Sequence, residues 1–461
     1  MVGRIWKPPF PLNGHIFSYG RTDSGKTWKL IAVVQYYYEQ GYKIWDLWGG
    51  KRKEGGFWCF PSDENKLWFE YQKEVGYMKE PGPKQYEIKL LFPFFINEIP
   101  NKLPKKLPRI QSKLFTLYFK DIDIQEISTI TGALPNSAQR AWNTIKKELS
   151  DEACGEDILA WFEKKENRKI KSTNFYEDFI KPFCKSKILT GKSFKYNLDL
   201  IKEAKEKHII TILMDEYTPE KYKMFFILHI MRKVYEMGEK DIIHRKNLGL
   251  FRELNYFMKV QDESAQDAEQ KQIMRNEFSN IARYGRSAFL IAGDTQSPNE
   301  VKGLVEGQDD MLCLNQLPGM KDREIACERL VRDGRMSGHQ RDFLGSVEMT
   351  KEKMVVVCRN QIAKLIKRVQ PPRTKCFKII DGNFLKVWKK IYNEWDDNVK
   401  EYKKYLEDLY YKRKVELEKE KEEVEEVKFQ DELVRVKATD DKHKRYIENQ
   451  QKEIEEEELI I

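Results

Sequence analysis

The stretch that decides the fold is HIFSYGRTDSGKT, residues 15–27. Residues 15–19 form a short apolar run, which predicts a buried strand. Residues 20–27 match the Walker A pattern, in which two glycines enclose four residues and are followed by Lys and Thr. The pattern of residues 25–40 predicts a helix, and the apolar run at 44–48 predicts a second strand. This order of strand, loop, helix and strand predicts the start of a P-loop nucleotide-binding fold.

The loop supplies the chemistry that a nucleoside triphosphate needs. Gly20 and Gly25 let the backbone wrap a phosphate, because glycine adopts positive φ and has no Cβ to obstruct the approach. Lys26 is expected on the β- and γ-phosphates of ATP, and the Thr27 hydroxyl is expected to coordinate Mg²⁺. Asp23 is unusual here, because an acid inside the loop opposes the local positive field. The predicted nucleotide-binding residues are Gly20, Arg21, Thr22, Asp23, Ser24, Gly25, Lys26 and Thr27.

Hydrolysis also needs an acid that orients Mg²⁺ and a glutamate that polarises the attacking water. Two places offer them, each directly after an apolar run that predicts a strand. Asp215 and Glu216 follow residues 209–214 and have the usual strand-then-Asp-Glu form, so both are candidates for the metal site. Arg252 and Glu253 follow a second run, with arginine where the magnesium acid is expected. The residue types alone favour the first place.

The charge of the chain is unevenly distributed. The net charge is +9, but residues 381–461 carry 18 Lys and Arg against 24 Asp and Glu, whereas residues 1–380 carry 65 against 50. A basic body favours a polyanionic partner, with nucleic acid as the first candidate. The alternative is a solvated surface whose basic excess has no function.

Cysteine spacing and hydropathy bear on the compartment. The 7 cysteines are scattered without a C-x-x-C pair, which predicts neither a zinc site nor a disulfide framework and suits a reducing cytosol. The N-terminus lacks an apolar signal stretch, and no run of 18 apolar residues occurs. We therefore expect a cytoplasmic protein without membrane insertion, which would need a partner to associate with a membrane.

The composition divides the chain into four parts: a P-loop start (1–56), a large and mostly helical insertion (57–206), the remainder of an ATPase core (207–376), and a C-terminal part (377–461). Apolar residues at three- and four-residue steps in the last part predict an amphipathic or coiled-coil helix before an acidic tail, and this helix is a candidate site for a protein partner. The expected fold class is α/β, with a RecA-like, ASCE-type P-loop NTPase sheet flanked by helices.

The insertion contains one segment with two interpretations. Proline-rich sequence gives way to helical patterns over about 112–149. The stretch DIDIQEISTITGALPNSAQRAWNTIKKEL, residues 121–149, fits a helix-turn-helix that binds DNA. More often such a pattern is simply two packed helices.

The order of these features resembles the FtsK–HerA superfamily of ATP-driven translocases, especially its HerA-like and conjugation-type members. The resemblance covers roughly residues 10–375, and the P-loop is its strongest element. KIWDLWGG is similar to the second strand of the family, and IARYGRSAFLIAGDTQSPNEV is similar to its signature strand, with a basic residue at the start and Gln at the end. KMVVVCRNQ and the later VQPPR are similar to the closing segment.

The resemblance implies roles for particular residues. Gln296 would sense the γ-phosphate, and Arg283 or Arg286 would act as an arginine finger on the ATP of a neighbouring subunit. A finger that acts between subunits implies a homo-oligomeric ring, with a hexamer expected.

The resemblance also reverses the choice of catalytic glutamate. In this family the acids usually lie on the strand just before the one that ends in Gln. Glu253 lies 43 residues before Gln296, whereas Glu216 lies 80 before it, so Glu253 is favoured and Glu216 remains the rival. The departure is Arg252 in the position of the acid, and the candidates to compensate for it from a neighbouring strand end are Asp46 and Asp215.

Three functions remain open at this point. The leading one is an ATP-hydrolysing ring motor that translocates double-stranded DNA in packaging, transfer or segregation. The second is an ATP-dependent factor for protein assembly or secretion. The third is a nucleotide-dependent scaffold with weak hydrolysis, in which the C-terminal helix recruits the partner.

Overall fold

The computed structural model describes residues 14–47, 58, 84, 86–93, 103–104, 110–164, 167, 171, 173–212, 219–254, 265–296, 298, 310–366, 395–396, 411–412, 415–419, 441–442 and 444–445. The chain divides into two units, residues 1–400 and residues 401–461. In the second unit the described residues are helical. The predicted boundary at 376/377 lies outside the described residues.

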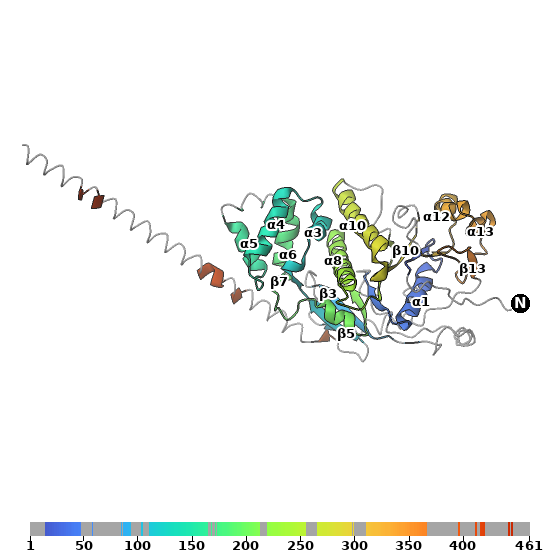
Figure 1. The fold of residues 1–461 in the computed structure, drawn as a ribbon, viewed down its shortest axis with the longest axis horizontal. Helices are drawn as coiled ribbons and strands as arrows, with labels where there is room; N and C mark the ends of the chain where they lie inside the picture. Colours follow the sequence, from blue (N-terminus) through green and yellow to red (C-terminus); the bar gives the residue numbers. More distant parts are fainter. Residues whose placement is uncertain are drawn as a thin grey trace, which may run out of the picture. The chain divides into compact units, whose positions relative to one another are not determined.

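The first unit is built on a ten-stranded sheet flanked by helices (Figure 1). Its strands are β1 Ile16–Tyr19, β2 Lys43–Asp46, β3 Ile88–Pro93, β5 Ile110–Phe115, β8 Ile209–Ile212, β9 Asn247–Phe251, β10 Phe289–Thr295, β11 Met311–Leu314, β12 Met354–Cys358 and β13 Lys364–Ile366. Two small two-stranded pairings join β4 Leu103–Pro104 with β14 Trp395–Asp396, and β6 Leu117–Tyr118 with β7 Leu189–Thr190.

The α-helices are α1 Lys26–Glu39, α3 Ile124–Thr131, α4 Asn136–Glu148, α5 Gly155–Glu163, α6 Lys181–Lys185, α7 Leu200–Lys205, α8 Glu220–Glu239, α10 Ala265–Tyr284, α12 Met320–Arg332 and α13 Gly338–Phe343. A π-helical turn, η4 Phe175–Ile180, precedes α6. Short 3₁₀ turns lie at η2 Phe119–Asp121 and η5 Gly285–Ser287.

The strand order is β13-β12-β11-β1-β10-β9-β2-β8-β3-β5. All pairings are parallel except those of β12, which runs antiparallel to both β11 and β13. The loop strand β1 therefore lies between β10 and β11, and β9 is the next strand beyond β10. In a mostly parallel sheet of this kind, ligands bind where the carboxyl ends of the strands meet. This order places the ends of β1, β10 and β9 at one edge.

Both faces of the sheet are covered. Strand residues such as Phe17, Phe251 and Ile291 belong to one hydrophobic core together with buried residues of α8 and α10, which lie side by side in Figure 1. Their neighbours on the other face, such as Ile16 and Leu250, are equally buried but lie outside that core. Helix α1 packs on β1, β10 and β2 and covers this second face. Double coverage explains why the strands are continuous apolar runs.

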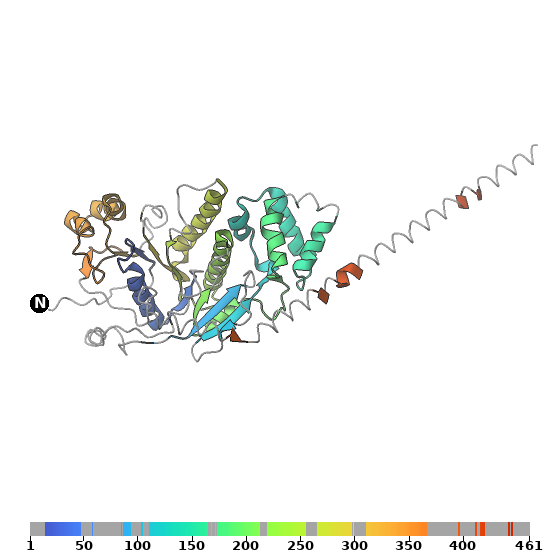
Figure 2. The same cartoon turned by 180° about the vertical axis from the view of Figure 1, so that it is seen from behind.

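The described part of the predicted insertion contains strands of the large sheet as well as helices. Residues 112–115, which the sequence assigned to the start of the helical pattern, instead belong to β5 Ile110–Phe115. Strands β3 and β5 pair in parallel and extend the sheet beyond β8, as Figure 2 shows from behind. These two strands were not predicted from the sequence, in which lysines stand among the apolar residues. Whether such a short segment becomes a strand depends on partner strands far along the chain, which the local sequence does not show.

The helical part of the insertion packs around aromatic side chains. Trp142 of α4 contacts Phe119, Phe175 and Phe179, and its indole Nε1–H donates to the Ile122 carbonyl at 3.2 Å. Helices α3 and α4 flank a short turn with Gly132 at φ 75°. The predicted pair of helices is thus present, while DNA binding by α4 stays a prediction.

None of the helices in the described part of the chain is long and apolar enough to cross a membrane.

Candidate nucleotide site

The loop between β1 and α1 has backbone geometry that explains both of its glycines. Gly25 has φ 77°, in the left-handed region that favours glycine. At Gly20 the requirement is space, because a Cβ there would lie 2.5 Å from Ser24 Oγ and 2.7 Å from the Asn315 Cβ. Asp23 also has positive φ, at 66°, a conformation that Asp tolerates better than most residues. The unusual acid therefore occupies a turn position that suits its backbone.

Two polar residues of the loop, Lys26 and Ser24, are buried, and their side chains engage no protein group among the described residues. Lys26 is 5% exposed, and no described side chain or backbone oxygen accepts from its ammonium. The Ser24 hydroxyl is also buried without a hydrogen-bond partner in the described chain. Buried polar groups without partners cost free energy unless a ligand satisfies them. A phosphate at the N-terminus of α1 fits both groups.

Thr27, the predicted magnesium ligand, is tied to the neighbouring strand. Its Oγ1 donates to Asp294 Oδ2 at 2.6 Å, and Asp294 is the penultimate residue of β10. The other carboxylate oxygen of Asp294 accepts from the backbone N–H of Glu253, also at 2.6 Å. One carboxylate therefore connects the loop to the turn that follows β9.

Glu253 has a strained backbone. Its φ is 56°, which is uncommon outside Gly, Asn and Asp, and such residues cluster at functional sites. The turn packs closely on β10, because a Cβ on Gly293 would lie 2.5 Å from a Leu254 methyl carbon. Gly293 and Asp294 thus hold Glu253 beside the loop, half-buried at the edge of the sheet.

Arg252 and Asp46 form a buried ion pair one strand further away. Arg252 is 5% exposed, and its guanidinium lies 3.2 Å from Asp46 Oδ2. The indole N–H of Trp58 donates to the same oxygen at 3.1 Å. The sequence left open whether Asp46 compensates for the missing acid at position 252. The structure instead uses Asp46 to neutralise Arg252.

Lys29 connects the loop to two segments from later in the chain. Its ammonium donates to the Ser24 carbonyl at 3.2 Å, to Asn315 Oδ1 at 2.7 Å and to the Lys353 carbonyl at 2.6 Å. Burial lowers the pKa of Lys29 to about 7. Asn315 in turn donates to the Ser18 hydroxyl at 3.0 Å and to the Tyr19 carbonyl at 2.8 Å. Local sequence carries no signal for the roles of Lys29, Asn315 and Asp294, nor for strand β11, which ends directly before Asn315.

Gln296, the predicted sensor, lies next to the loop. It follows the carboxyl end of β10, and its Oε1 accepts from the Thr22 hydroxyl at 2.7 Å. The structure therefore brings Gln296, Glu253 and the Walker A residues together at one edge of the sheet. Residues 215 and 216 lie outside the described residues. Their predicted strand, β8, is separated from β1 by β10, β9 and β2.

The two candidate finger arginines lie at the opposite edge. Arg283 is in the last turn of α10 and Arg286 is in the short turn before β10, so both precede the amino end of a strand whose carboxyl end faces the loop. The 7 residues of β10 place them about 20 Å from the loop of their own chain. Arg286 Nε pairs with Asp310 at 3.2 Å, whereas Arg283 is exposed and stacks over Tyr284.

Three kinds of solved structure are similar to this chain. The bacterial conjugative coupling protein TrwB, in an unbound monoclinic form, aligns over 79% of this chain and 87% of its own, with 9% identity and a TM-score of 0.42. VirB4 of Thermoanaerobacter pseudethanolicus aligns over 79% and 92%, with 12% identity and a TM-score of 0.45. The genome packaging NTPase B204 of Sulfolobus turreted icosahedral virus 2, in complex with ATP-gammaS, aligns over 77% and 98%, with 8% identity and a TM-score of 0.30.

No protein-family model matches the sequence, and no curated protein matches it. The assignment of the fold therefore depends on the arrangement of strands and helices in this structure. With a phosphate-binding loop between β1 and α1, and a mostly parallel sheet covered on both faces, the chain has the α/β fold of P-loop NTPases.

Proposed function

We propose that this protein is an ATP-hydrolysing motor that translocates double-stranded DNA as a homo-oligomeric ring. One observation carries the nucleotide part: in the described structure the Ser24 hydroxyl is buried without a partner and Lys26, 5% exposed, contacts no acceptor, both at the N-terminus of α1 in a Walker A loop. ATP satisfies both groups with its phosphates. Mg²⁺, when bound with the nucleotide, would neutralise phosphate charge and be held through Thr27.

Glu253 is the proposed catalytic glutamate. It follows β9, two strands from β1, and its backbone N–H is fixed by Asp294, which also binds Thr27. Glu216 follows the strand β8, which is four positions from β1 and hence about 19 Å across the sheet. The carboxylate of Glu253 polarises the attacking water, and the Gln296 amide reports the presence of the γ-phosphate.

Paired glutamine variants test this assignment. Glu253→Gln should bind ATP with unchanged affinity and lose turnover, because the amide keeps the shape but cannot act as a base. Glu216→Gln is the matched control and should keep most of the turnover. The reverse ranking, measured by phosphate release and nucleotide binding, would move the catalytic acid to the end of β8.

The position of Arg283 supports the ring. An arginine about 20 Å from the loop of its own chain cannot reach that nucleotide, so as a finger it would act on the nucleotide of a second copy. Arg283 is preferred over Arg286, because Arg286 is already paired with Asp310. Mixing Arg283→Ala with Lys26→Ala subunits should restore part of the hydrolysis at interfaces that join an intact loop to an intact finger.

Duplex DNA is proposed as the substrate because residues 1–380 carry 65 basic against 50 acidic side chains, and because the sequence resembles translocases. The test is ATP hydrolysis with and without duplex DNA, with Lys26→Ala as the control for contaminating activity. We expect stimulation by DNA of any sequence, lost as salt rises, since phosphate contacts dominate such binding. A rate of ATP hydrolysis that is the same with and without DNA would favour the alternative. That alternative is an ATP-dependent protein assembly factor with its partner on the C-terminal helix.

A further inference from the structure

We propose that Asp294 performs the task of the magnesium-orienting acid that is missing from position 252, so that this acid has moved one strand across the sheet. The inference rests on the proposed nucleotide function and concerns how the chain holds the metal that accompanies ATP. Asp294 is a positioning residue, which acts through Thr27 and Glu253.

The end of β9 cannot supply the acid. Arg252 stands in that position, and its guanidinium is buried against Asp46 at 3.2 Å. Trp58 donates to the same carboxylate, so both the cation and its counter-ion are committed to each other. The usual place for a metal-directed carboxylate is occupied by a neutralised pair.

The next strand supplies a carboxylate at the same level. Gly293 of β10 lies opposite Phe251 of β9 in the strand register, so Asp294 follows at the level of Arg252. Because β10 is the direct neighbour of β1, this carboxylate is one strand spacing, about 4.8 Å, from the loop strand, whereas the end of β9 is two. The displacement brings the acid closer to Thr27.

The hydrogen bond to Thr27 prepares its hydroxyl to bind a cation. A hydroxyl has one proton and two lone pairs. The Thr27 proton is directed to Asp294 Oδ2 at 2.6 Å, so the lone pairs remain for a metal ion. A carboxylate that fixes the hydroxyl in this way raises the affinity of the site for Mg²⁺, as partners of metal ligands generally do.

The second oxygen couples the metal ligand to the catalytic turn. Asp294 Oδ1 accepts from the Glu253 N–H at 2.6 Å and holds this residue at its positive φ. Asp294 is completely buried, and both of its oxygens bind groups of the nucleotide site. One side chain therefore sets the orientation of the metal ligand and of the proposed catalytic glutamate together.

The test is the magnesium dependence of nucleotide binding, measured with a fluorescent ATP analogue in EDTA and in increasing magnesium chloride. For Asp294→Asn we expect the magnesium requirement to rise about 10-fold or more, while affinity in EDTA stays within about 2-fold. Asp46→Asn is the matched control, a second buried acid at the same edge, and should leave the magnesium requirement unchanged. Equal losses with and without magnesium would show that Asp294 only supports the fold, and would overturn the inference.

A second variant covers the case in which Asp294→Asn does not fold. Asp294→Glu keeps the charge but moves it by one methylene, and it should also raise the magnesium requirement without changing binding in EDTA. An unchanged requirement in a folded Asp294→Glu protein would count against the inference. Failure of the proposed function is distinguishable, because the unaltered protein would then bind no ATP under any condition.

Discussion

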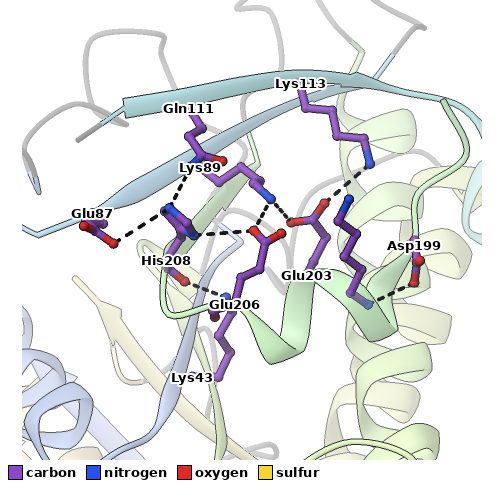
Figure 3. Close-up of polar contacts among 10 residues, drawn as sticks. Lys43, Glu87, Lys89, Gln111, Lys113, Asp199, Glu203, Glu206 and His208 are labelled. Atoms are coloured by element: carbon purple, nitrogen blue, oxygen red, sulfur yellow. Dashed lines mark hydrogen bonds and ion pairs between the residues drawn. The ribbon is translucent and has the colours of Figure 1, made fainter. Parts of the chain in front are cut away.

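Lysine side chains at the two edges of the sheet differ in whether the described protein provides their partners. At the carboxyl edge, the described structure leaves the ammonium of Lys26 and the hydroxyl of Ser24 without protein partners. At the amino edge, near β2, β3 and β8, lysines and carboxylates are joined in one network (Figure 3). Lys89 binds Glu203 at 2.6 Å and also Glu206.

Lysine side chains show this contrast most directly. Burial lowers the pKa of Lys89, but its hydrogen bonds to Glu203 and Glu206 outweigh that effect and raise it. Lys43 donates to the carbonyls of Glu206 and His208 at 2.7 and 2.6 Å, and burial lowers its pKa to about 7. Both lysines thus have protein partners, whereas Lys26 has none among the described residues. The network at the amino edge uses charge for stability, while Lys26 at the carboxyl edge keeps its charge for a ligand.

The largest expected effect is the loss of nucleotide binding in Lys26→Ala. Removing a charge-assisted contact to two phosphates should weaken ATP binding by about 100-fold or more. The free energy of unfolding should change by no more than about 1 kcal/mol, because Lys26 has no partner among the described residues that the substitution would remove. Titration calorimetry and urea unfolding measure the two quantities. A large loss of stability in Lys26→Ala would show that Lys26 supports the fold, as the lysines at the amino edge do.

Lys89→Met should have the opposite effects on the two quantities, the ATP affinity and the free energy of unfolding. Glu203 is 1% exposed, and removing its partner should lower the free energy of unfolding by about 3–5 kcal/mol while ATP affinity stays the same. The double variant Lys89→Met, Glu203→Leu should recover much of this loss, since no buried charge remains unpaired. If the double variant is no more stable than the single one, the network is not held together by this pair.

His15 should make the amino edge sensitive to acid. Burial lowers its pKa to about 4, and its neutral ring accepts from the Ile291 N–H at 2.9 Å while Nε2 faces the Ala282 carbonyl at 2.7 Å. The unfolded chain takes up this proton near pH 6.5. The contribution of neutral His15 to the free energy of unfolding is therefore fully present above that pH. The free energy of unfolding should fall by up to about 3 kcal/mol as the pH decreases towards 4.

Urea unfolding at several pH values checks this prediction. His15→Gln should flatten the profile between pH 6.5 and 4, because the amide does not titrate. His339→Gln is the control, since His339 is exposed and should leave the slope unchanged. Equal slopes in all three proteins would exclude His15 as the cause.

The smallest expected effect is that of a substitution at Gly338, for which Gly20 in the Walker A loop provides the contrast. A Cβ on Gly338 meets nothing within 4 Å, so Gly338→Ala should stabilise the protein by roughly 0.5–1 kcal/mol. Gly20→Ala, in contrast, should abolish ATP binding, because its Cβ would collide with Ser24 and Asn315. Thermal unfolding with and without ATP separates the two. A destabilised Gly338→Ala would show that the space in the structure is not the deciding factor.

Local sequence predicted the parts of the fold whose signal is local. The Walker A loop, its flanking strand and helix, and the runs that became β9, β10 and β12 were identified from residues that lie next to one another. Strand β11 was missed, because only 4 residues define it and it is recognisable only beside β1.

The residues of the candidate site that belong to a recognisable motif were predicted from the sequence, and the others were not. Asp294 had no local signal, because its role depends on Thr27, 267 positions away in the chain. Lys29 was missed for the same reason, since two of its three acceptors lie on Asn315 and Lys353. Contacts between distant segments decide which polar residues serve the nucleotide, and spacing alone does not contain them.

The distance between Arg283 and the loop of its own chain has a consequence for mixed populations. If Arg283 completes the site of the next subunit, specific activity depends on protein concentration and falls steeply on dilution below assembly. A cell that produces Arg283→Ala beside the unaltered chain would then lose activity at sites whose own residues are all intact. The altered gene copy would behave as dominant, although the protein it encodes still binds ATP normally.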